Sequence, residues 1–167
     1  SFGDSPYQSL SSFAGNPYFI DIDQLLEKGL LTPSECEQAQ MAGDFVRYGL
    51  LFDTRFALLH KAFLRALPTM ENDRAFALFC QENAWWLDDW ALYMAIKQHR
   101  QMAPWYLWER PLRKREAQAL QQAGREYEQD VLFHRFLQFL FYEQWDALKA
   151  YANQNGVQIL GDVPIYV

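Results

Sequence analysis

The sequence predicts a predominantly α-helical chain of the α/β class, with only one or two short strands. Through much of its 167 residues, apolar side chains recur every three or four positions, which is typical of helices that bury one face. Strand-like sequence is confined to residues 19–22 and 158–160, and two strand pieces cannot close a barrel. A helix at 143–155, a turn at Asn155-Gly156 and the apolar run after it predict one helix-to-strand step of a parallel sheet.

The N-terminal part predicts a loop followed by a short capped helix. Residues 1–17 are rich in Ser, Gly, Pro and Asn, which predicts an ordered loop, and residues 19–22 follow as a short extended piece. Asp23 is suited to cap a helix at 24–28, because its carboxylate can accept a hydrogen bond from a first-turn N–H. Gly29 can end this helix, since Gly adopts the left-handed conformation of many helix ends.

The next helices are predicted from a cap and from apolar spacing. Thr32-Pro33-Ser34-Glu35 combines an N-cap residue, Pro at the first helical position and Glu at the third, which is a capping box. A longer helix is predicted over 54–67, and Pro68 is expected to end it. The helical period continues over 72–82 and 85–98.

The second half predicts a loop and then long helices. Residues 102–111 form a loop rich in Trp and Pro. A straight helix over 112–154 would be more than about 60 Å long at about 1.5 Å per residue, so we predict a break near Gly124. The segment 131–142 is apolar on nearly all sides, which indicates a helix that is buried on most of them.

The last helix and the segment after it carry a candidate functional acid. Trp145, Leu148 and Ala152 share one face of the predicted helix, which indicates that this face is buried. Asp162 follows the strand predicted at 158–160, and functional groups of parallel sheets gather at the carboxyl ends of strands. A lone Asp after a strand is more often a turn former or a helix cap, and both interpretations stay open.

Composition restricts the classes of function. The net charge of −6 and the pI near 5.0 argue against a nucleic-acid-binding surface, which needs clustered Lys and Arg. Cys36 and Cys80 are too few for a disulfide framework, so a reducing cytoplasm is the expected location. The sequence has neither a membrane-spanning apolar stretch nor a signal-peptide pattern, so we expect no membrane partner. Aromatic residues reach 17%, and flat rings both pack cores and stack on sugar rings.

One constellation suggests chemistry but has a simpler explanation. Asp88 and Asp89 lie among Trp residues at 85–90, as an acid pair beside sugar-stacking rings would. Adjacent helical residues point about 100° apart, so we favour an amphipathic helix with Trp86 and Trp90 inward and at least one Asp in water.

The three histidines do not indicate a metal site. They are far apart in sequence and lack Cys, Asp or Glu at ligand spacing. His134 is predicted to be a buried imidazole with its hydrogen bonds satisfied, and His99 a cation near a helix end. No metal or other cofactor is therefore expected.

The two ends of the chain carry the most specific motifs. Residues 3–17 (GDSPYQSLSSFAGNP) closely resemble the signature loop of the 4-α-glucanotransferases, the amylomaltases or disproportionating enzymes of glycoside hydrolase family 77. Residues 161–167 (GDVPIYV) resemble a second stretch of the same family. Three short motifs between them also match in order, at 85–89 (WWLDD), 112–115 (LRKR) and 144–145 (QW). The resemblance thus covers the whole chain.

The resemblance implies a piece of a larger fold. The family has a (β/α)8 TIM barrel with helical insertions, and this chain would be the insertion-bearing stretch after the second strand, ending just past the third. Residues 1–22 would be a substrate-cleft loop with a short extended piece, 23–111 a helical insertion subdomain, and 112–167 a long helical region leading into a barrel strand. All three would belong to one incomplete catalytic domain.

The resemblance also implies a reaction. Family enzymes cut an α-1,4 glucan, hold the donor covalently through an Asp, and pass it to the 4-hydroxyl of another glucan, while a Glu acts first as acid and then as base. The nucleophile, the acid/base and a further Asp lie beyond Val167 in the family, so we expect a fragment that is inactive alone. A non-catalytic helical glucan-binding or scaffold domain is the alternative.

Five residues are expected at substrate by resemblance. Ser5 and Tyr7 would lie beside the catalytic centre, and Asp162 at the catalytic end of its strand. Phe2 and Phe52 align with positions that are Tyr in some relatives and are associated there with a second glucan groove, so stacking would remain while a hydroxyl hydrogen bond is lost. The expected partner is a maltooligosaccharide, and exposed strand edges and helix faces predict self-association of the fragment.

Overall fold

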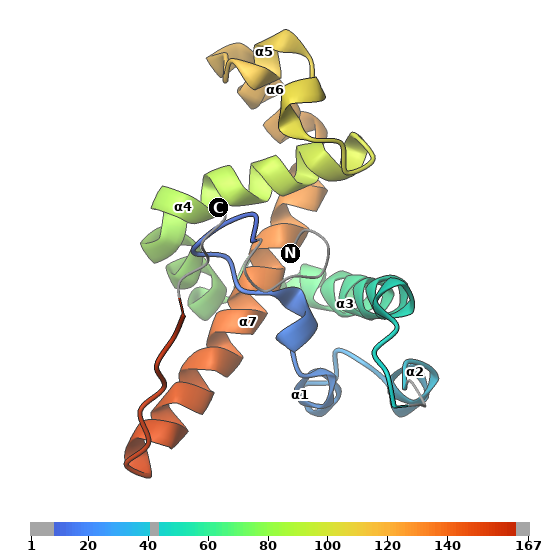
Figure 1. Ribbon diagram of the computed structural model, residues 1–167, viewed down its shortest axis with the longest axis vertical. Coiled ribbons are helices and arrows are strands. Elements are labelled where there is room, and N and C mark those ends of the chain that lie inside the picture. The colour runs from blue at the N-terminus through green and yellow to red at the C-terminus, as the bar shows by residue number, and fades with distance from the viewer. Residues whose placement is uncertain (1–8, 41–43, 163–167) are drawn as a thin grey trace.

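A computed structural model describes residues 9–40 and 44–162 as an arrangement of helices, with no strand among them (Figure 1). The elements in chain order are η2 (Pro17–Phe19), α1 (Ile22–Glu27), α2 (Pro33–Gln38), α3 (Tyr48–Met70), α4 (Arg74–His99), η3 (Trp105–Leu107), α5 (Arg110–Arg113), α6 (Ala117–Glu126) and α7 (Glu128–Gln154). Here η denotes a 3-10 helix.

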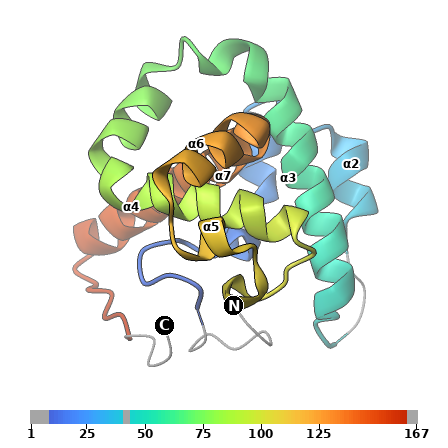
Figure 2. The same ribbon diagram turned by 90° about the horizontal axis from the view of Figure 1, so that it is seen from above.

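Helix α7 forms the centre of the molecule. It packs along α4 and against α3 and α6, and Figure 2 shows it surrounded by these helices. Its N-terminal half buries residues on several sides, including Val131, Phe136 and Leu140. The predicted buried helix at 131–142 is therefore confirmed.

Two apolar clusters lie along α7. The larger one joins the N-terminal helices to α7, and the Phe63 ring centroid lies 5.4 Å from that of Phe133 and 5.7 Å from that of Phe136. The smaller cluster joins the second half of α4 to α6 and the start of α7, through Ala95, Ala123 and Val131. Both clusters use the same central helix, and the larger one holds the N-terminal helices to the C-terminal half.

The short helices α1 and α2 begin at residues whose side chains cap them. The Thr32 side chain accepts from the Glu35 backbone N–H, and the Glu35 carboxylate accepts from the Thr32 N–H, which confirms the capping box. Arg65 of α3 holds the same carboxylate at 2.7 Å and 2.8 Å and lowers the pKa of Glu35, so the cap also ties α2 to α3. Helix α1 is capped by Asp21 instead of Asp23, because Asp21 Oδ1 accepts from the Asp23 N–H at 2.9 Å.

The long helices are longer than predicted. Helix α3 begins at Tyr48 and continues two residues past Pro68 to Met70, so Pro68 does not end it. The runs at 72–82 and 85–98 form one helix, α4, whose N-terminus is capped by Asp73. Apolar spacing alone does not mark the start of α3, because residues 48–50 in its first turn are exposed and carry no periodic signal.

The predicted helix break is present, three residues from its expected place. Helix α6 ends at Glu126 and α7 begins at Glu128, with Tyr127 between them. Tyr127 stacks on His99 with ring centroids 4.0 Å apart, and its hydroxyl accepts a hydrogen bond from Arg100. These contacts with the end of α4, instead of Gly124, fix the corner.

Both predicted strands are wrong for the described residues. Residues 19–22 run from the end of η2 to the start of α1, and residues 157–162 follow α7 without regular secondary structure. Leu160 is 97% exposed there. An extended segment becomes a strand only beside a neighbour that bonds its backbone groups.

The C-terminal half of α7 is a helix as predicted, but one side of it is uncovered among the described residues. Leu148 is exposed, and Trp145 and Ala152 are only half-buried, so the expected buried face is wrong for Leu148. This part of α7 extends beyond the other helices in Figure 1. None of the helices in the described ranges is both long and apolar enough for a membrane span.

Candidate functional site

The N-terminal loop is held on α7 by two glutamines. Gln138 Oε1 accepts from the Gly15 N–H at 2.7 Å, and its Nε2 donates to the Gly15 carbonyl at 3.1 Å. Gln144 bonds both backbone groups of Asp21 in the same way, at 2.7 Å and 3.2 Å. A glutamine amide offers the same donor and acceptor as a peptide group, so each side chain replaces a missing backbone neighbour.

The two clamps fix the register of the loop on the helix. Both pairs join residues 123 positions apart, so the loop runs in the same direction as α7 (Figure 1). The environments differ, because Gln138 is only 1% exposed whereas Gln144 lies nearer to solvent. Tyr142 adds a third contact by donating its hydroxyl hydrogen to the Phe13 carbonyl. The loop is thereby fixed at both ends of the stretch 13–21.

Gly15 is needed at the point of closest approach. A Cβ atom at this position would lie 2.0 Å from Cδ1 of Phe141, well inside van der Waals contact. Only a residue without a side chain lets the loop backbone reach the Gln138 amide.

We expect Gly15→Ala to lower the free energy of unfolding by about 1–3 kcal/mol, because the added methyl forces Phe141 or the loop to shift. Urea denaturation measures this change. Gly124→Ala in α6 is the matched control, since no atom beyond its chain neighbours and the nearby backbone of its own helix lies within 4 Å of the new methyl position. Helix propensity predicts stabilisation by up to about 1 kcal/mol. Equal effects of the two substitutions would contradict the steric argument.

On its other flank the loop contacts α3 through aromatic residues. Arg55 donates to the Ile20 carbonyl at 3.0 Å, and the Tyr18 ring lies 6.3 Å from that of Phe56. Phe52 continues this row one helical turn away, 4.7 Å from Phe56, and is 44% exposed. Phe52 therefore presents an exposed ring beside the loop.

The predicted substrate residues are only partly described. Phe2, Ser5 and Tyr7 lie outside the described residues. Asp162 is exposed in the segment after α7. The assignment of all five residues to substrate binding, including that of Phe52, stays a prediction.

The adjacent acids are not a facing pair. Asp88 bonds Arg135 and Asp89 bonds Arg115, each at 2.8 Å, and both carboxylates are exposed. Trp86 is buried and Trp90 half-buried on the same helix. The predicted amphipathic helix is confirmed, and the two acids hold α4 to its neighbours.

The histidines serve the packing of α4 and α7. His99 ends α4, as predicted, and its Nε2 lies 2.7 Å from Asp130 Oδ2. His134 is buried as predicted, but its Nε2 has no hydrogen-bond partner in the described part of the chain. The prediction that its hydrogen bonds are satisfied is therefore wrong. Burial lowers the pKa of His134 to about 4, against the opposing effect of Asp130. Residues 9–40 and 44–162 contain no cluster of three acidic, His or Cys side chains suited to a metal ion.

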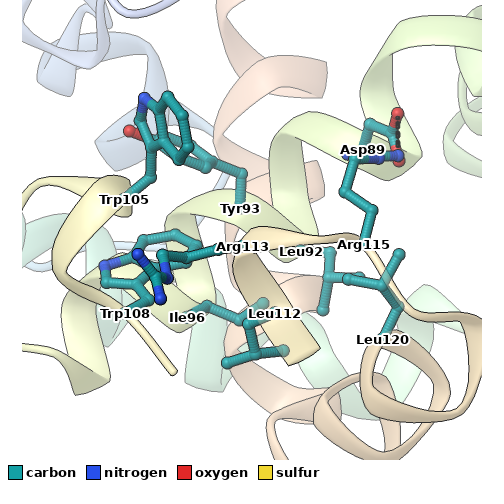
Figure 3. A pocket seen from close by; sticks show the side chains of 10 residues that line it. All are labelled: Asp89, Leu92, Tyr93, Ile96, Trp105, Trp108, Leu112, Arg113, Arg115 and Leu120. Atoms are coloured by element: carbon teal, nitrogen blue, oxygen red, sulfur yellow. Dashed lines mark hydrogen bonds and ion pairs between the residues drawn. The ribbon is translucent and has the colours of Figure 1, made fainter. Parts of the chain in front are cut away.

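A pocket of about 320 Å³ opens between α4, η3, α5 and α6 (Figure 3). Aromatic rings lie on one side of it and an ion pair on the other. Its lining consists of Asp89, Leu92, Tyr93, Ile96, Trp105, Trp108, Leu112, Arg113, Arg115 and Leu120. The pocket combines flat apolar faces with charged hydrogen-bonding groups.

Sequence reasoning missed both the glutamine clamps and the pocket. The clamps join residues 123 positions apart, and no local pattern reports such a pairing. The pocket had a partial signal in the Trp-rich segment 102–111 and the motif at 112–115, but the partner helix could not be identified.

Comparisons with known proteins match the whole chain. A model of glycoside hydrolase family 77, described as 4-alpha-glucanotransferase, matches residues 1–167. The 4-alpha-glucanotransferase of Thermus thermophilus is 45% identical over 168 residues, covering 99% of this chain and 33% of that protein. The enzyme of Clostridium butyricum is 40% identical over 169 residues, covering 100% and 34%.

A solved structure matches the arrangement of the helices. The amylomaltase from Streptococcus agalactiae in complex with acarbose superposes with a TM-score of 0.93 at 38% identity, covering all of this chain and 34% of that one. The chain thus spans about a third of the length of the relatives that it matches. Because the family match includes every residue and the helical arrangement agrees, the chain belongs to the 4-alpha-glucanotransferase family.

Proposed function

We propose that this chain is part of a cytoplasmic enzyme that transfers α-1,4-glucan segments between maltodextrins. The observation that carries the proposal is the match of all 167 residues to one family, together with about 33% coverage of the T. thermophilus relative. A second support is the amylomaltase of S. agalactiae, whose structure contains acarbose.

The proposed reaction is a retaining double displacement. A carboxylate attacks C1 of the donor sugar and forms a glycosyl ester, while a carboxylic acid gives its proton to the leaving 4-oxygen. The 4-hydroxyl of the acceptor then attacks C1, the second carboxylate takes that hydroxyl's proton, and the nucleophile leaves with its electron pair. In this proposal both carboxyl groups, and the further Asp, belong to parts of the enzyme outside these 167 residues.

This chain would supply one wall of the substrate cleft within a (β/α)8 barrel. Ser5, Tyr7 and Asp162 would contact the sugar near C1, and Phe2 and Phe52 would stack on a more distant part of the glucan. The clamped loop supports this role, because its stretch 13–21 is held by Gln138, Gln144 and Tyr142. A fixed loop keeps substrate contacts oriented at small entropic cost. No cofactor takes part in the proposed reaction.

We expect the full-length enzyme that contains this chain to convert maltotriose into glucose and longer maltodextrins. The 167-residue chain alone should produce none, because the proposed catalytic carboxyl groups are elsewhere. Chromatography of the sugars measures both reactions. Hydrolysis to glucose without longer products would contradict the transferase assignment, and turnover by the 167-residue chain would contradict the proposed division of roles.

A further inference from the structure

The pocket between α4, η3, α5 and α6 lies at the end of the molecule away from α1 and α2 (Figure 1). Its volume of about 320 Å³ is at the lower end of the range of roughly 300–1,000 Å³ for small-molecule sites. The proposed function above assigns no role to any residue that lines it.

The aromatic wall is fixed in place. The rings of Tyr93 and Trp108 lie 5.3 Å apart at an angle of 35°, and the Trp108 indole N–H donates to the Ala103 carbonyl at 3.1 Å. Trp105, also in the lining, is 55% exposed. Buried partners hold the inner rings, while the outer ring offers a free apolar face. A preformed wall of this kind loses little side-chain freedom on binding.

The opposite side of the pocket carries an exposed ion pair, which offers both donors and acceptors. Nη2 of Arg115 lies 2.8 Å from each carboxylate oxygen of Asp89. On the aromatic side, next to Trp108 in Figure 3, Arg113 donates to the Tyr106 carbonyl at 3.3 Å, which anchors its guanidinium beside the rings. Arg115 has φ = 54°, an unfavourable backbone conformation for a residue with a side chain, and its ion pair ties the junction between α5 and α6 to α4.

The aromatic rings and the charged groups of the pocket together favour a neutral sugar over other small ligands. A glucose ring has a flat C–H face, which packs on aromatic rings, and an edge of hydroxyl groups that both donate and accept hydrogen bonds. Arg113 and Arg115 offer N–H donors, and Asp89 offers a carboxylate acceptor. A phosphate would be repelled by the Asp89 carboxylate, whereas a neutral sugar hydroxyl can accept from Arg113 and donate to Asp89.

We propose that this pocket binds glucose units of a long α-glucan, with Trp105 as the stacking platform and Arg113 as a hydroxyl donor. The inference rests on the proposed function for the identity of the sugar. A second attachment point on the same polymer raises the local concentration of glucan chain around the enzyme. Long glucans therefore gain affinity from the pocket, and maltotriose does not.

The test uses the full-length enzyme in native gels that contain increasing glycogen, with dissociation constants taken from the mobilities. We expect Trp105→Ala to raise the glycogen dissociation constant about three- to tenfold, and Trp105→Tyr to restore most of the affinity. Leu107→Ala is the matched control, because Leu107 is 68% exposed, lies on the same short helix η3 and is not part of the lining. Disproportionation of maltotriose should stay unchanged in all three variants.

Arg113→Gln provides a second variant in case Trp105→Ala unfolds, and thermal melting reports the folding of each protein. We expect Arg113→Gln to weaken glycogen binding while the melting temperature stays near that of the wild type. Equal mobility of the wild type, Trp105→Ala and Arg113→Gln would overturn the inference. Failure of the wild type to disproportionate maltotriose would instead overturn the proposed function, since the gel reads glycogen binding independently of turnover.

Discussion

Replacing Gln138 by Ala is expected to lower the free energy of unfolding by about 3–4 kcal/mol. The substitution removes both hydrogen bonds to the half-buried Gly15 and leaves its N–H and carbonyl without these partners, at a cost of about 1–3 kcal/mol for each group that stays unsatisfied. Because Gln138 is 1% exposed, water cannot replace the amide without opening the contact between the loop and α7. Urea denaturation followed by circular dichroism measures the loss.

The same substitution should also reduce catalysis in the full-length enzyme. In the proposed function, residues 1–8 carry Ser5 and Tyr7, and the clamp at Gly15 is the buried attachment that follows them in the chain. We expect a decrease in kcat of at least about tenfold under conditions where the variant is still folded, because a small displacement of positioning groups slows a reaction strongly. A purely structural clamp would lower the melting temperature and leave kcat of the folded enzyme unchanged.

Gln144→Ala is the matched control for the energetic argument. Gln144 makes the same pair of hydrogen bonds to Asp21, but in a solvent-accessible position. Water can then satisfy the exposed backbone groups, so the expected loss is only about 0.5–1.5 kcal/mol. Losses of equal size at the two positions would show that burial does not determine the strength of the clamps.

Local patterns predicted the parts of the fold that are locally determined. The capping box at Thr32 and Glu35 involves neighbouring residues, and the buried helix at 131–142 is visible as apolar residues on nearly all sides. The predicted strands were wrong because a strand depends on a neighbour that is distant in sequence. Residues 158–160 have the apolar composition of a strand, but the described part of the chain supplies no neighbour to pair with them. Composition gives a segment the tendency to form a strand, but the strand forms only where a neighbouring strand can pair with it.

In the candidate site, too, local sequence features were predicted and contacts between distant residues were not. The motif at 3–17 identified the family, because a long specific sequence can be compared directly. The two hydrogen bonds between the Gln138 amide and the Gly15 backbone could not be predicted, since a glutamine in an apolar helix segment has no local sequence signature. His134 illustrates the same limit, because its burial was predicted but the absence of a partner for Nε2 in the described part of the chain depends on its neighbours in space.

We expect the protein to lose stability as the pH falls from about 6.5 to about 4, in part through His134. Burial lowers the pKa of this imidazole from its ordinary value of 6.5 to about 4 in the folded protein, although Asp130 acts in the opposite direction. Between these two values the unfolded chain binds a proton that the folded chain does not, so acid favours unfolding. The difference corresponds to at most about 3 kcal/mol, and the slope from this group disappears below pH 4.

His134→Leu isolates this contribution, because other groups also titrate in the same range. At pH 8 the variant and the wild type should have similar stability, since the neutral ring is buried with Nε2 unbonded among the described residues and Leu has a similar volume. The variant should then become progressively more stable than the wild type as the pH falls to 4, as measured by urea denaturation at each pH. His134→Met repeats the comparison with a side chain that adapts its shape. Parallel pH profiles for the wild type and both variants would mean that His134 takes up its proton without unfolding, and that water reaches its ring in the folded protein.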